Sequence, residues 1–272
     1  VDFVESLEED LVRRDFSFNA IAFDPKNKQF IDKFSGIDDI RNNRLKVIGD
    51  AYLRFCEDGL RIIRLARFIS QFKVTPEPKS LDAILKIRDT AQFRSSDALR
   101  IELFKLLNLS NPSSGLKLLL KAQIFYAIFP NFPFSKFPNT LLIEEGINRF
   151  YKIPQRQILI RLFGLLILLV DESLCTENSW LQIGENLNLT MKQKQIINRL
   201  YQSWTTFPSD LESSEFKRWV RQTGMNTSED LLPLIFLRAE ILGDSKFLAK
   251  KELIMNMVQK ILIRFRGNAD RE

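Results

Sequence analysis

The side chains best suited to chemistry lie in one stretch where acidic and basic residues alternate at helical spacing, Glu57-Asp58-Gly59-Leu60-Arg61-Ile62-Ile63-Arg64-Leu65-Ala66-Arg67. Steps of three and four residues on one helix would bring Asp58, Arg61 and Arg64 to a common side, with Arg67 at its edge. Three arginines against two acids at one end leave a positive strip that suits phosphate groups. The alternative is a solvated face with Glu57–Arg61 and Asp58–Arg61 pairs, each worth about 0.2–0.5 kcal/mol, and the spacing alone favours it.

A second cluster supports the phosphate interpretation. Arg13, Arg14 and Asp15 are consecutive, and an apolar, aromatic segment, Ser17–Phe23, follows directly. We expect this cluster to face the arginine strip.

The elements that must position these clusters are a short mixed segment followed by many helices. The first 15 residues predict a short helix capped by Ser6, with Glu9 three positions further on. Ser17–Phe23 and Gln29–Ile31 flank a turn and predict a hairpin. From Asp50 the apolar spacing is helical until Thr75-Pro76. Further helices are expected at Ser80–Arg88, Ser96–Leu107, Leu116–Phe129, Thr140–Tyr151, Gln155–Val170, Trp180–Leu187, Met191–Trp204, Ser213–Gly224, Ser228–Leu242 and Phe247–Phe265, with the clearest break at Asn111–Gly115.

Composition excludes several classes of protein. The 272 residues are 45% hydrophobic and 27% charged, which is a globular balance, and only 10 Gly and 10 Pro favour a mostly helical fold. Histidine is absent, so Ser-His-Asp hydrolases and histidine-ligated metal hydrolases are excluded. Cys56 and Cys175 can form neither a four-ligand zinc site nor a disulfide framework, which indicates an intracellular, reducing compartment.

Charge and hydropathy indicate an anionic partner and no membrane segment. The net charge is +6, and residues 111–272 carry 21 Lys and Arg against 16 Asp and Glu. This excess suits RNA. The longest uncharged apolar run, Leu162–Val170, is too short to cross a bilayer, and no signal peptide is evident. We therefore expect a cytoplasmic protein.

Four ordered elements resemble those of bacterial-type (class II) tRNA nucleotidyltransferases and poly(A) polymerases, the CCA-adding enzymes among them. Arg13-Arg14-Asp15-Phe16-Ser17-Phe18-Asn19-Ala20 resembles the family's Arg-Arg-Asp-Phe-x-x-Asn-Ala element. The others are Ile31–Ile40 with its sequel Val47–Asp50, the Glu-Asp-x-x-Arg-x-x-Arg element within Arg54–Arg64, and the neck helix at Asp97–Leu107.

The resemblance implies a nucleotide-reading role for the arginine strip. Cytosine and adenine each present an amino donor beside a ring-nitrogen acceptor, whereas guanine and uracil present the reverse pattern. By resemblance, Asp58 accepts a hydrogen bond from the amino group and Arg61 donates one to the ring nitrogen. A wrong base leaves buried polar groups unpaired.

The resemblance also implies supporting roles for neighbouring residues. Arg64 and Arg67 would reach the triphosphate or brace the pocket, and Arg14 would contact the nucleotide. Asp15 and Asn19 would hold the strand and the ribose side. Glu57 would orient Arg61.

The implied fold is mostly α: a small α+β remnant of a nucleotidyltransferase head, then a helical neck, body and tail. The expected domains are residues 1–49 for the head remnant, 50–110 for the neck with its base-reading helix, and 111–272 for a tRNA-binding body and tail. The implied reaction transfers CMP or AMP from CTP or ATP to the 3′ end of tRNA with Mg²⁺.

The sequence departs from the family pattern in two ways. Ser35-Gly36 stands where the family usually has two glycines. The family's metal-binding Asp-x-Asp motif lies upstream of the Arg-Arg-Asp element, and Val1–Val12 contains no such motif. We therefore expect the magnesium ligands in a missing or separate N-terminal segment, and an inactive chain on its own. The alternatives are a non-catalytic RNA-binding module, or one subunit of a split nucleotidyltransferase or poly(A) polymerase.

Overall fold

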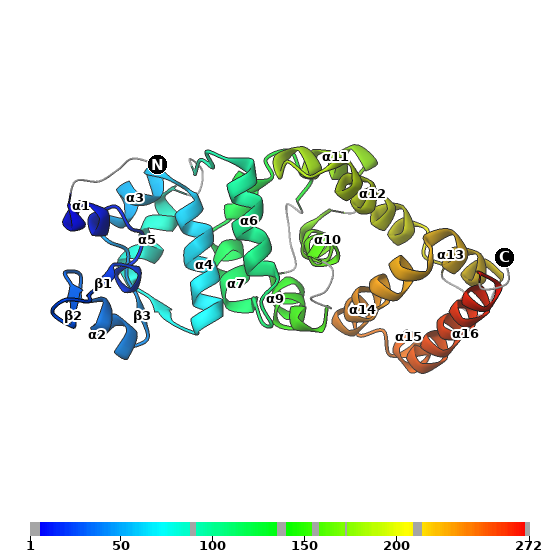
Figure 1. The fold of residues 1–272 in the computed structure, drawn as a ribbon. Coiled ribbons are helices and arrows are strands. Elements are labelled where there is room, and N and C mark those ends of the chain that lie inside the picture. Colours follow the sequence, from blue (N-terminus) through cyan, green and yellow to red (C-terminus); the bar gives the residue numbers. More distant parts are fainter. Residues whose placement is uncertain are drawn as a thin grey trace. The chain divides into compact units, whose positions relative to one another are not determined.

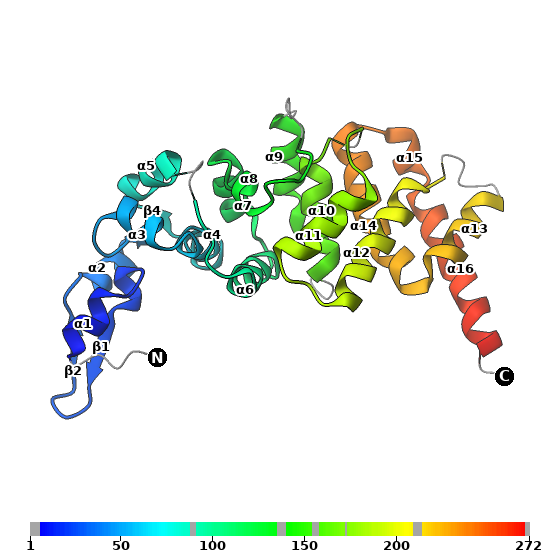
Figure 2. The same ribbon diagram turned by 90° about the horizontal axis from the view of Figure 1, so that it is seen from above.

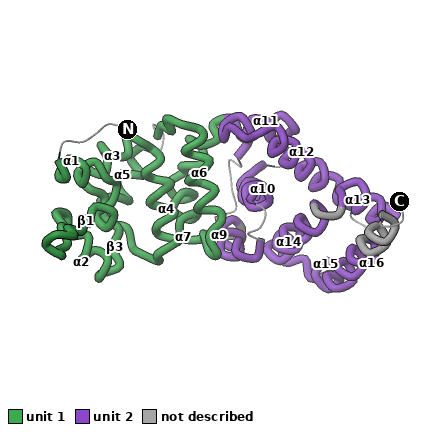
Figure 3. Tube along the Cα trace, viewed as in Figure 1, with its two compact units in different colours: residues 1–130 green, residues 131–272 purple. Residues whose placement is uncertain are grey.

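The chain is mostly helical with two small two-stranded sheets, so the predicted fold class is confirmed. The computed structural model describes residues 6–87, 91–134, 140–153, 158–171, 173–208 and 214–269. They fall into two compact units, residues 1–130 and 131–272 (Figure 3). The boundaries expected at residues 49 and 110 both lie inside the first unit, and that finer division stays a prediction.

The first unit begins with a short helix and the expected hairpin. Helix α1 (Leu7–Val12) starts where the Ser6 hydroxyl accepts a hydrogen bond from the Glu9 amide at 3.2 Å, which satisfies one of the helix's unpaired donors. Strands β1 (Ile21–Asp24) and β2 (Gln29–Asp32) pair antiparallel. The hairpin prediction is confirmed, but its first strand is shorter than expected.

Residues Ser17–Asn19 form the 3₁₀ helix η1 instead of a strand. The reason is tertiary. The Ser17 amide donates to the Lys46 carbonyl at 3.0 Å, and the Asn19 amide folds back to the Phe16 carbonyl at 2.9 Å. A β-bridge between Phe16 and Val47 holds this segment in place, so its donors are used before a hairpin ladder can extend to them.

The start of helix α2 (Gly36–Arg41) explains why Ser35 can stand where the family usually has the first of two glycines. The Asp32 carboxylate accepts from the Gly36 and Ile37 amides, each at 2.8 Å. Ser35 adopts a left-handed φ of 58°, a region that favours glycine. At Gly36 a Cβ would lie 2.3 Å from the Ser17 carbonyl oxygen, so only the second glycine is required by close packing.

The helix expected to run unbroken from Asp50 is two helices, α3 (Ala51–Glu57) and α4 (Leu60–Phe72). Asp58 has an extended backbone, with φ −155° and ψ 107°. The Gly59 amide donates to the Gln92 carbonyl at 3.0 Å, and a Cβ on Gly59 would lie 2.6 Å from that oxygen. The interpretation of residues 57–67 as one helix is therefore wrong, because this contact separates the two helices at Asp58.

Four more helices complete this unit. They are α5 (Pro78–Ile87), α6 (Ser96–Leu107), α7 (Ser113–Lys121) and α8 (Ile124–Ile128), while β3 (Arg44–Leu45) pairs in parallel with β4 (Thr75–Pro76). Helix α4 packs against α6 and α7 (Figure 1). The α7 contact is so close that a Cβ on Gly115 would lie 2.2 Å from the Ala66 carbonyl oxygen. Gly115 therefore belongs to a helix rather than to the expected break.

The second unit is entirely helical apart from one isolated β-bridge within the residues described there (Figures 1 and 2). Trp180, Trp204 and Trp219 are all buried, as expected of core residues. Its elements are α9 (Thr140–Asn148), η2 (Phe150–Lys152), α10 (Ile158–Leu169), α11 (Glu177–Asn186), α12 (Met191–Thr205), α13 (Ser214–Thr223), α14 (Met225–Leu242), α15 (Ser245–Ala249) and α16 (Lys251–Ala269).

Two of the predicted helices, Leu116–Phe129 and Phe247–Phe265, are each interrupted and form two helices in the structure. Gln123, at a φ of 57°, separates α7 from α8, and Lys250 separates α15 from α16. The predicted ends at Arg88, Gln155 and Ser213 lie outside the described residues. Cys56 and Cys175 form no disulfide in the part of the chain that the structure describes. In the part of the chain that the structure describes, no helix is long and apolar enough to span a membrane.

Candidate functional site

The two predicted clusters meet in one cavity of the first unit. The cavity has a volume of about 480 Å³ and is polar. Four of the five predicted nucleotide contacts line it: Arg14, Asp58, Arg61 and Arg64. The full lining is Arg13, Arg14, Asp15, Asn19, Asp58, Arg61, Arg64 and Phe68.

Aromatic packing brings the clusters together. The ring of Phe68, on α4, meets the rings of Phe16 and Phe18 edge-on, with centroids 5.5 and 5.1 Å apart. Phe16 is fully buried, and burial of such a ring stabilises the fold by about 1.5–3 kcal/mol. Because α4 buries its apolar face, Arg61 and Arg64 lie toward the cavity with their side chains only partly exposed.

Asp58 lies at the start of α4 rather than on a helical face. Its Oδ1 accepts a hydrogen bond from the Leu60 amide at 3.0 Å, which fixes the carboxylate at the helix N-terminus. Among the residues that the structure describes, Asp58 has no ion-pair partner, so the Asp58–Arg61 pair of the solvated-face alternative is not formed. The carboxylate remains able to accept a further hydrogen bond.

Arg61 is held from behind by its own helix junction. Its Nη1 donates to the Arg54 carbonyl at 2.6 Å and to Glu57 Oε2 at 2.8 Å. The hydrogen bond from Arg61 lowers the pKa of Glu57, so Glu57 stays ionised. Geometrically, Glu57 does what the resemblance implies, because it fixes the guanidinium that faces the cavity.

Arg14 is held by Asp10 and by a backbone carbonyl. Its Nε and Nη2 donate to Asp10 Oδ2 at 3.1 and 2.8 Å, and its Nη1 donates to the Asn19 carbonyl at 2.9 Å. Arg13 occupies the other oxygen of Asp10. Hydrogen bonds from both arginines lower the pKa of Asp10. Arg14 is 46% exposed, which leaves its side chain accessible from the cavity.

Asp15 is the most buried carboxylate of the site, at 6% exposure. Its Oδ1 accepts from the Phe16 amide and from Asn19 Nδ2, both at 3.0 Å. Its Oδ2 lies 2.8 Å from Arg64 Nη2, but the angles do not satisfy a hydrogen bond, and both Oδ2 and Arg64 Nε are buried without one. Asp15 and Asn19 therefore hold the segment, as the resemblance implies.

Arg67 lies outside the lining of this cavity. Its Nε donates to Glu102 Oε2 and its Nη1 to Gln71 Oε1, each at 2.9 Å, and its guanidinium lies 4.0 Å from the Phe68 ring centroid. Of the two roles expected for Arg67, these contacts fit the one in which it braces the pocket. They join α4 to α6. The triphosphate role has no geometric support here.

Arg54 was not singled out from the sequence as a site residue. It precedes Arg61 by seven residues. If the helix were continuous, as the sequence suggests, this spacing would place both arginines on one side of it. Its Nη2 donates to the carbonyls of Arg13 and Arg14 at 2.7 and 2.8 Å. Its spacing from Glu57 and Arg61 is the one sequence signal that could have indicated a role for Arg54 in the site. The carbonyls that it binds could not have been predicted, because they belong to a distant part of the sequence.

The carboxylates of the cavity do not fit a magnesium ion. Asp15 uses both oxygens on Phe16, Asn19 and Arg64, and Asp58 accepts from the Leu60 amide at the start of α4. Nowhere in the described ranges do three or more His, Cys, Asp or Glu residues gather as a metal site.

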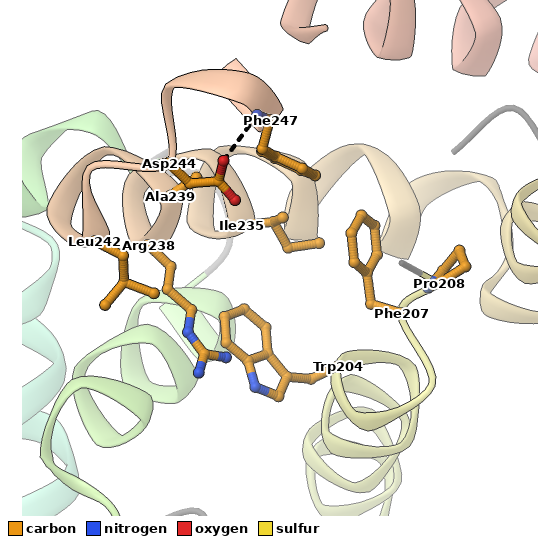
Figure 4. Close-up of a pocket in the computed structure, with 9 residues that line it drawn as sticks. All are labelled: Trp204, Phe207, Pro208, Ile235, Arg238, Ala239, Leu242, Asp244 and Phe247. Atoms are coloured by element: carbon orange, nitrogen blue, oxygen red, sulfur yellow. Dashed lines mark hydrogen bonds between the residues drawn. The ribbon is translucent and has the colours of Figure 1, made fainter. Parts of the chain in front are cut away.

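The second unit has a cavity of its own, of about 350 Å³, with aromatic walls (Figure 4). Trp204, Phe207 and Phe247 line it, and the Arg238 guanidinium lies 5.2 Å from the centroid of the Trp204 ring. The Asp244 carboxylate accepts from the Phe247 amide at 2.9 Å, which caps α15. The half-buried rings of Phe207 and Phe247 beside this cation suit a stacked, polar ring, whereas Trp204 is buried.

The cavity, with four guanidinium groups and two carboxylates in a mostly helical chain, has the charge and the hydrogen-bonding groups that suit an anionic ligand. Comparisons with known proteins agree. Residues 1–46 match the family described as poly A polymerase head domain. The chain is 31% identical over 257 residues to a CCA-adding enzyme of Staphylococcus haemolyticus, covering 94% of this chain and 58% of that protein. It is 42% identical over 123 residues to one from Lactococcus lactis, covering 45% of this chain and 30% of that protein.

Solved structures show the same fold. The CCA-adding enzyme of Bacillus stearothermophilus in complex with CTP superposes with a TM-score of 0.65 at 23% identity, over 96% of this chain and 60% of that one. The Thermotoga maritima enzyme complexed with tRNA superposes with a TM-score of 0.63 at 19% identity, over 90% of this chain and 61% of that one. Over nearly its whole length the chain is therefore similar to class II CCA-adding enzymes and poly(A) polymerases. It spans less than two thirds of the length of these relatives.

Proposed function

We propose that this chain selects the incoming nucleotide when CMP or AMP is transferred from CTP or ATP to the 3′ end of tRNA. The observation that supports the proposal is the convergence of Asp58 and Arg61 with Arg14 and Arg64 on one cavity. These four residues come from two distant parts of the sequence, and each carries a group able to bind a base edge or a phosphate.

The base is read by complementary donors and acceptors. The Asp58 carboxylate accepts from the exocyclic amino group of cytosine or adenine, and Arg61 donates to the adjacent ring nitrogen. Guanine and uracil would place a carbonyl against the carboxylate and an N–H against the guanidinium. Each such mismatch leaves a desolvated polar group unpaired, at a cost of about 1–3 kcal/mol.

The triphosphate is assigned to Arg14 and Arg64. Both are partly exposed, and each is already paired with a carboxylate, so little side-chain entropy is lost when an anion binds. Arg67 is assigned the bracing of α4 through Glu102. The tRNA is assigned to residues 111–272, where the excess of basic residues and the aromatic cavity beside Arg238 suit an RNA.

We propose that the magnesium ions of this reaction are held by ligands outside the described residues. We assign those ligands to a segment preceding residue 1 or to a separate polypeptide, and we expect the chain alone to bind nucleotide without incorporating it. A cytoplasmic location, where tRNA and free triphosphates meet, completes the proposal.

Equilibrium binding of CTP, ATP, GTP and UTP to the purified chain tests the base-reading role. We expect CTP and ATP to bind more tightly than GTP and UTP, and Asp58→Ala to remove that preference. Asp38→Ala is the matched control, because Asp38 is an exposed carboxylate whose ion-pair partner, Arg41, lies on its own helix.

The outcomes separate the alternatives. Equal affinity for all four nucleotides contradicts base reading. Binding of tRNA without binding of any nucleotide would favour the RNA-binding module. Nucleotide addition to tRNA lacking its 3′ end, restored by adding a polypeptide with the Asp-x-Asp segment, would favour a split enzyme.

A further inference from the structure

Arg54 ties the backbone of one predicted cluster to the side chain of the other. It lies on α3 with its side chain 17% exposed. Its Nη2 donates to the carbonyls of Arg13 at 2.7 Å and Arg14 at 2.8 Å, and lies 3.5 Å from that of Val12. These carbonyls are at the C-terminal end of α1, where helical carbonyls lack partners and a cation is favoured.

The same guanidinium reaches the group that orients Arg61. Arg54 Nη1 donates to Glu57 Oε2 at 2.9 Å, and Arg61 Nη1 donates to the same oxygen at 2.8 Å. Arg61 Nη1 also donates to the backbone carbonyl of Arg54 at 2.6 Å. Three hydrogen bonds in series therefore connect the Arg14 backbone to the Arg61 side chain: Arg54 to the Arg14 carbonyl, Arg54 to Glu57, and Arg61 to Glu57.

We propose that Arg54 is a positioning residue that sets the register between Arg14 and Arg61 and thereby determines how strictly the base is selected. It does not line the cavity, so it acts only through its neighbours. The proposal rests on the proposed function, because selection of a base is the property that the register controls.

The planar guanidinium is essential to this role. Arginine presents five N–H donors in a rigid fork, so one side chain can bind neighbouring carbonyls with one nitrogen and a carboxylate with another. The single ammonium of lysine cannot span the Arg13 and Arg14 carbonyls and Glu57 together. Arg54→Lys therefore keeps the charge and loses the connection.

The first measurement is binding of CTP, UTP and inorganic tripolyphosphate to the wild-type chain and to Arg54→Lys. We expect the ratio of CTP to UTP affinity to fall about tenfold, since a hydrogen bond to a charged group carries this much selectivity. Tripolyphosphate affinity should stay within about twofold, because Arg14 and Arg64 keep their own carboxylate partners. Arg41→Ala is the matched control: Arg41 also pairs with a carboxylate three residues away, but is exposed.

A merely structural role predicts a different result. If Arg54 only stabilises the fold, Arg54→Lys weakens all three ligands equally or none of them, and the selectivity ratio stays at the wild-type value. Either result overturns the proposal. A double variant with Glu57→Gln adds a further test: because the two residues act in series on Arg61, the double variant should lose no more selectivity than Glu57→Gln alone.

Amide hydrogen exchange of the nucleotide-free chain tests the connection independently of nucleotide selection. In Arg54→Lys we expect exchange at residues 13–16 and 58–61 to accelerate about tenfold, with the β1–β2 hairpin unchanged. If the wild-type chain shows no base preference, the proposed function fails, and the exchange data still decide whether Arg54 joins the two segments. Unchanged exchange at both segments would refute the positioning role. Because lysine keeps the charge, this test does not depend on whether Arg54→Ala folds.

Discussion

Arg64 on α4 and Asp15 before η1 face each other with Nη2 and Oδ2 2.8 Å apart, although neither completes a well-aligned hydrogen bond. The carboxylate is buried and the guanidinium is partly exposed to the cavity. The pair joins the two clusters electrostatically and leaves Arg64 with donors for an incoming anion. Together with Phe68 packed on Phe16, it fixes α4 beside the Arg-Arg-Asp segment.

Arg61→Ala should abolish the preference for cytosine and adenine. The substitution removes the donor to the ring nitrogen and leaves Glu57 without the hydrogen bond that holds its pKa low. We expect the CTP to UTP affinity ratio to fall by about tenfold or more. In the full-length gene product, incorporation of each of the four nucleotides into tRNA that lacks its 3′ end is the corresponding measurement. An unchanged nucleotide preference would refute the assignment of Arg61.

Arg64→Ala should destabilise the first unit because it leaves the buried Asp15 carboxylate without its cation. We expect the free energy of unfolding to fall by about 1–3 kcal/mol, measured by urea denaturation. Asp15→Asn in the Arg64→Ala background should recover part of this loss, since a neutral amide is cheaper to bury. Equal stability of Arg64→Ala and the wild type would show that solvent already screens the pair.

Stability should depend on the ionisation of Glu102. Burial would raise the pKa of this carboxyl, but hydrogen bonds and charge from Lys105 and Arg67 outweigh burial and hold the pKa below its ordinary value. Because the pKa is lower in the folded state, the stabilisation is fully present above the ordinary pKa and is lost as the pH falls through the folded-state value.

Glu102→Gln should therefore be less stable than the wild type at about pH 7 and equally stable well below about pH 4, as judged by urea denaturation at each pH. Glu9→Gln, an exposed glutamate of α1 outside this network, is the control. A stability difference that is the same at both pH values would mean that packing rather than charge accounts for the effect.

Binding of tRNA should weaken steeply with added salt. If the basic residues of 111–272 neutralise several phosphates, the logarithm of the association constant falls linearly with the logarithm of salt concentration, with a slope of about −0.7 to −0.9 per phosphate. Fluorescence anisotropy with labelled tRNA over a salt series measures this slope. A flat response would contradict phosphate-led binding.

Much of the site was predictable because the local sequence carries it. The four family elements, the hairpin and the cap at Ser6 each depend on residues a few positions apart, and the structure confirms the hairpin and this cap. Arg14, Asp58, Arg61 and Arg64 could be selected as a group because charge and spacing within two short stretches are visible in the sequence.

Contacts between distant residues decided the rest. The sequence by itself determined the residue types of the site and the helical class of the chain, since composition and short-range periodicity suffice for both. Tertiary structure alone decided that Asp58 leaves the helix, because the Gly59 amide pairs with Gln92. It also decided that Arg67 turns to Glu102 and that Arg54 reaches the carbonyls of Arg13 and Arg14. Each partner is far away along the chain, and no local pattern encodes which carbonyl or carboxylate a guanidinium will meet.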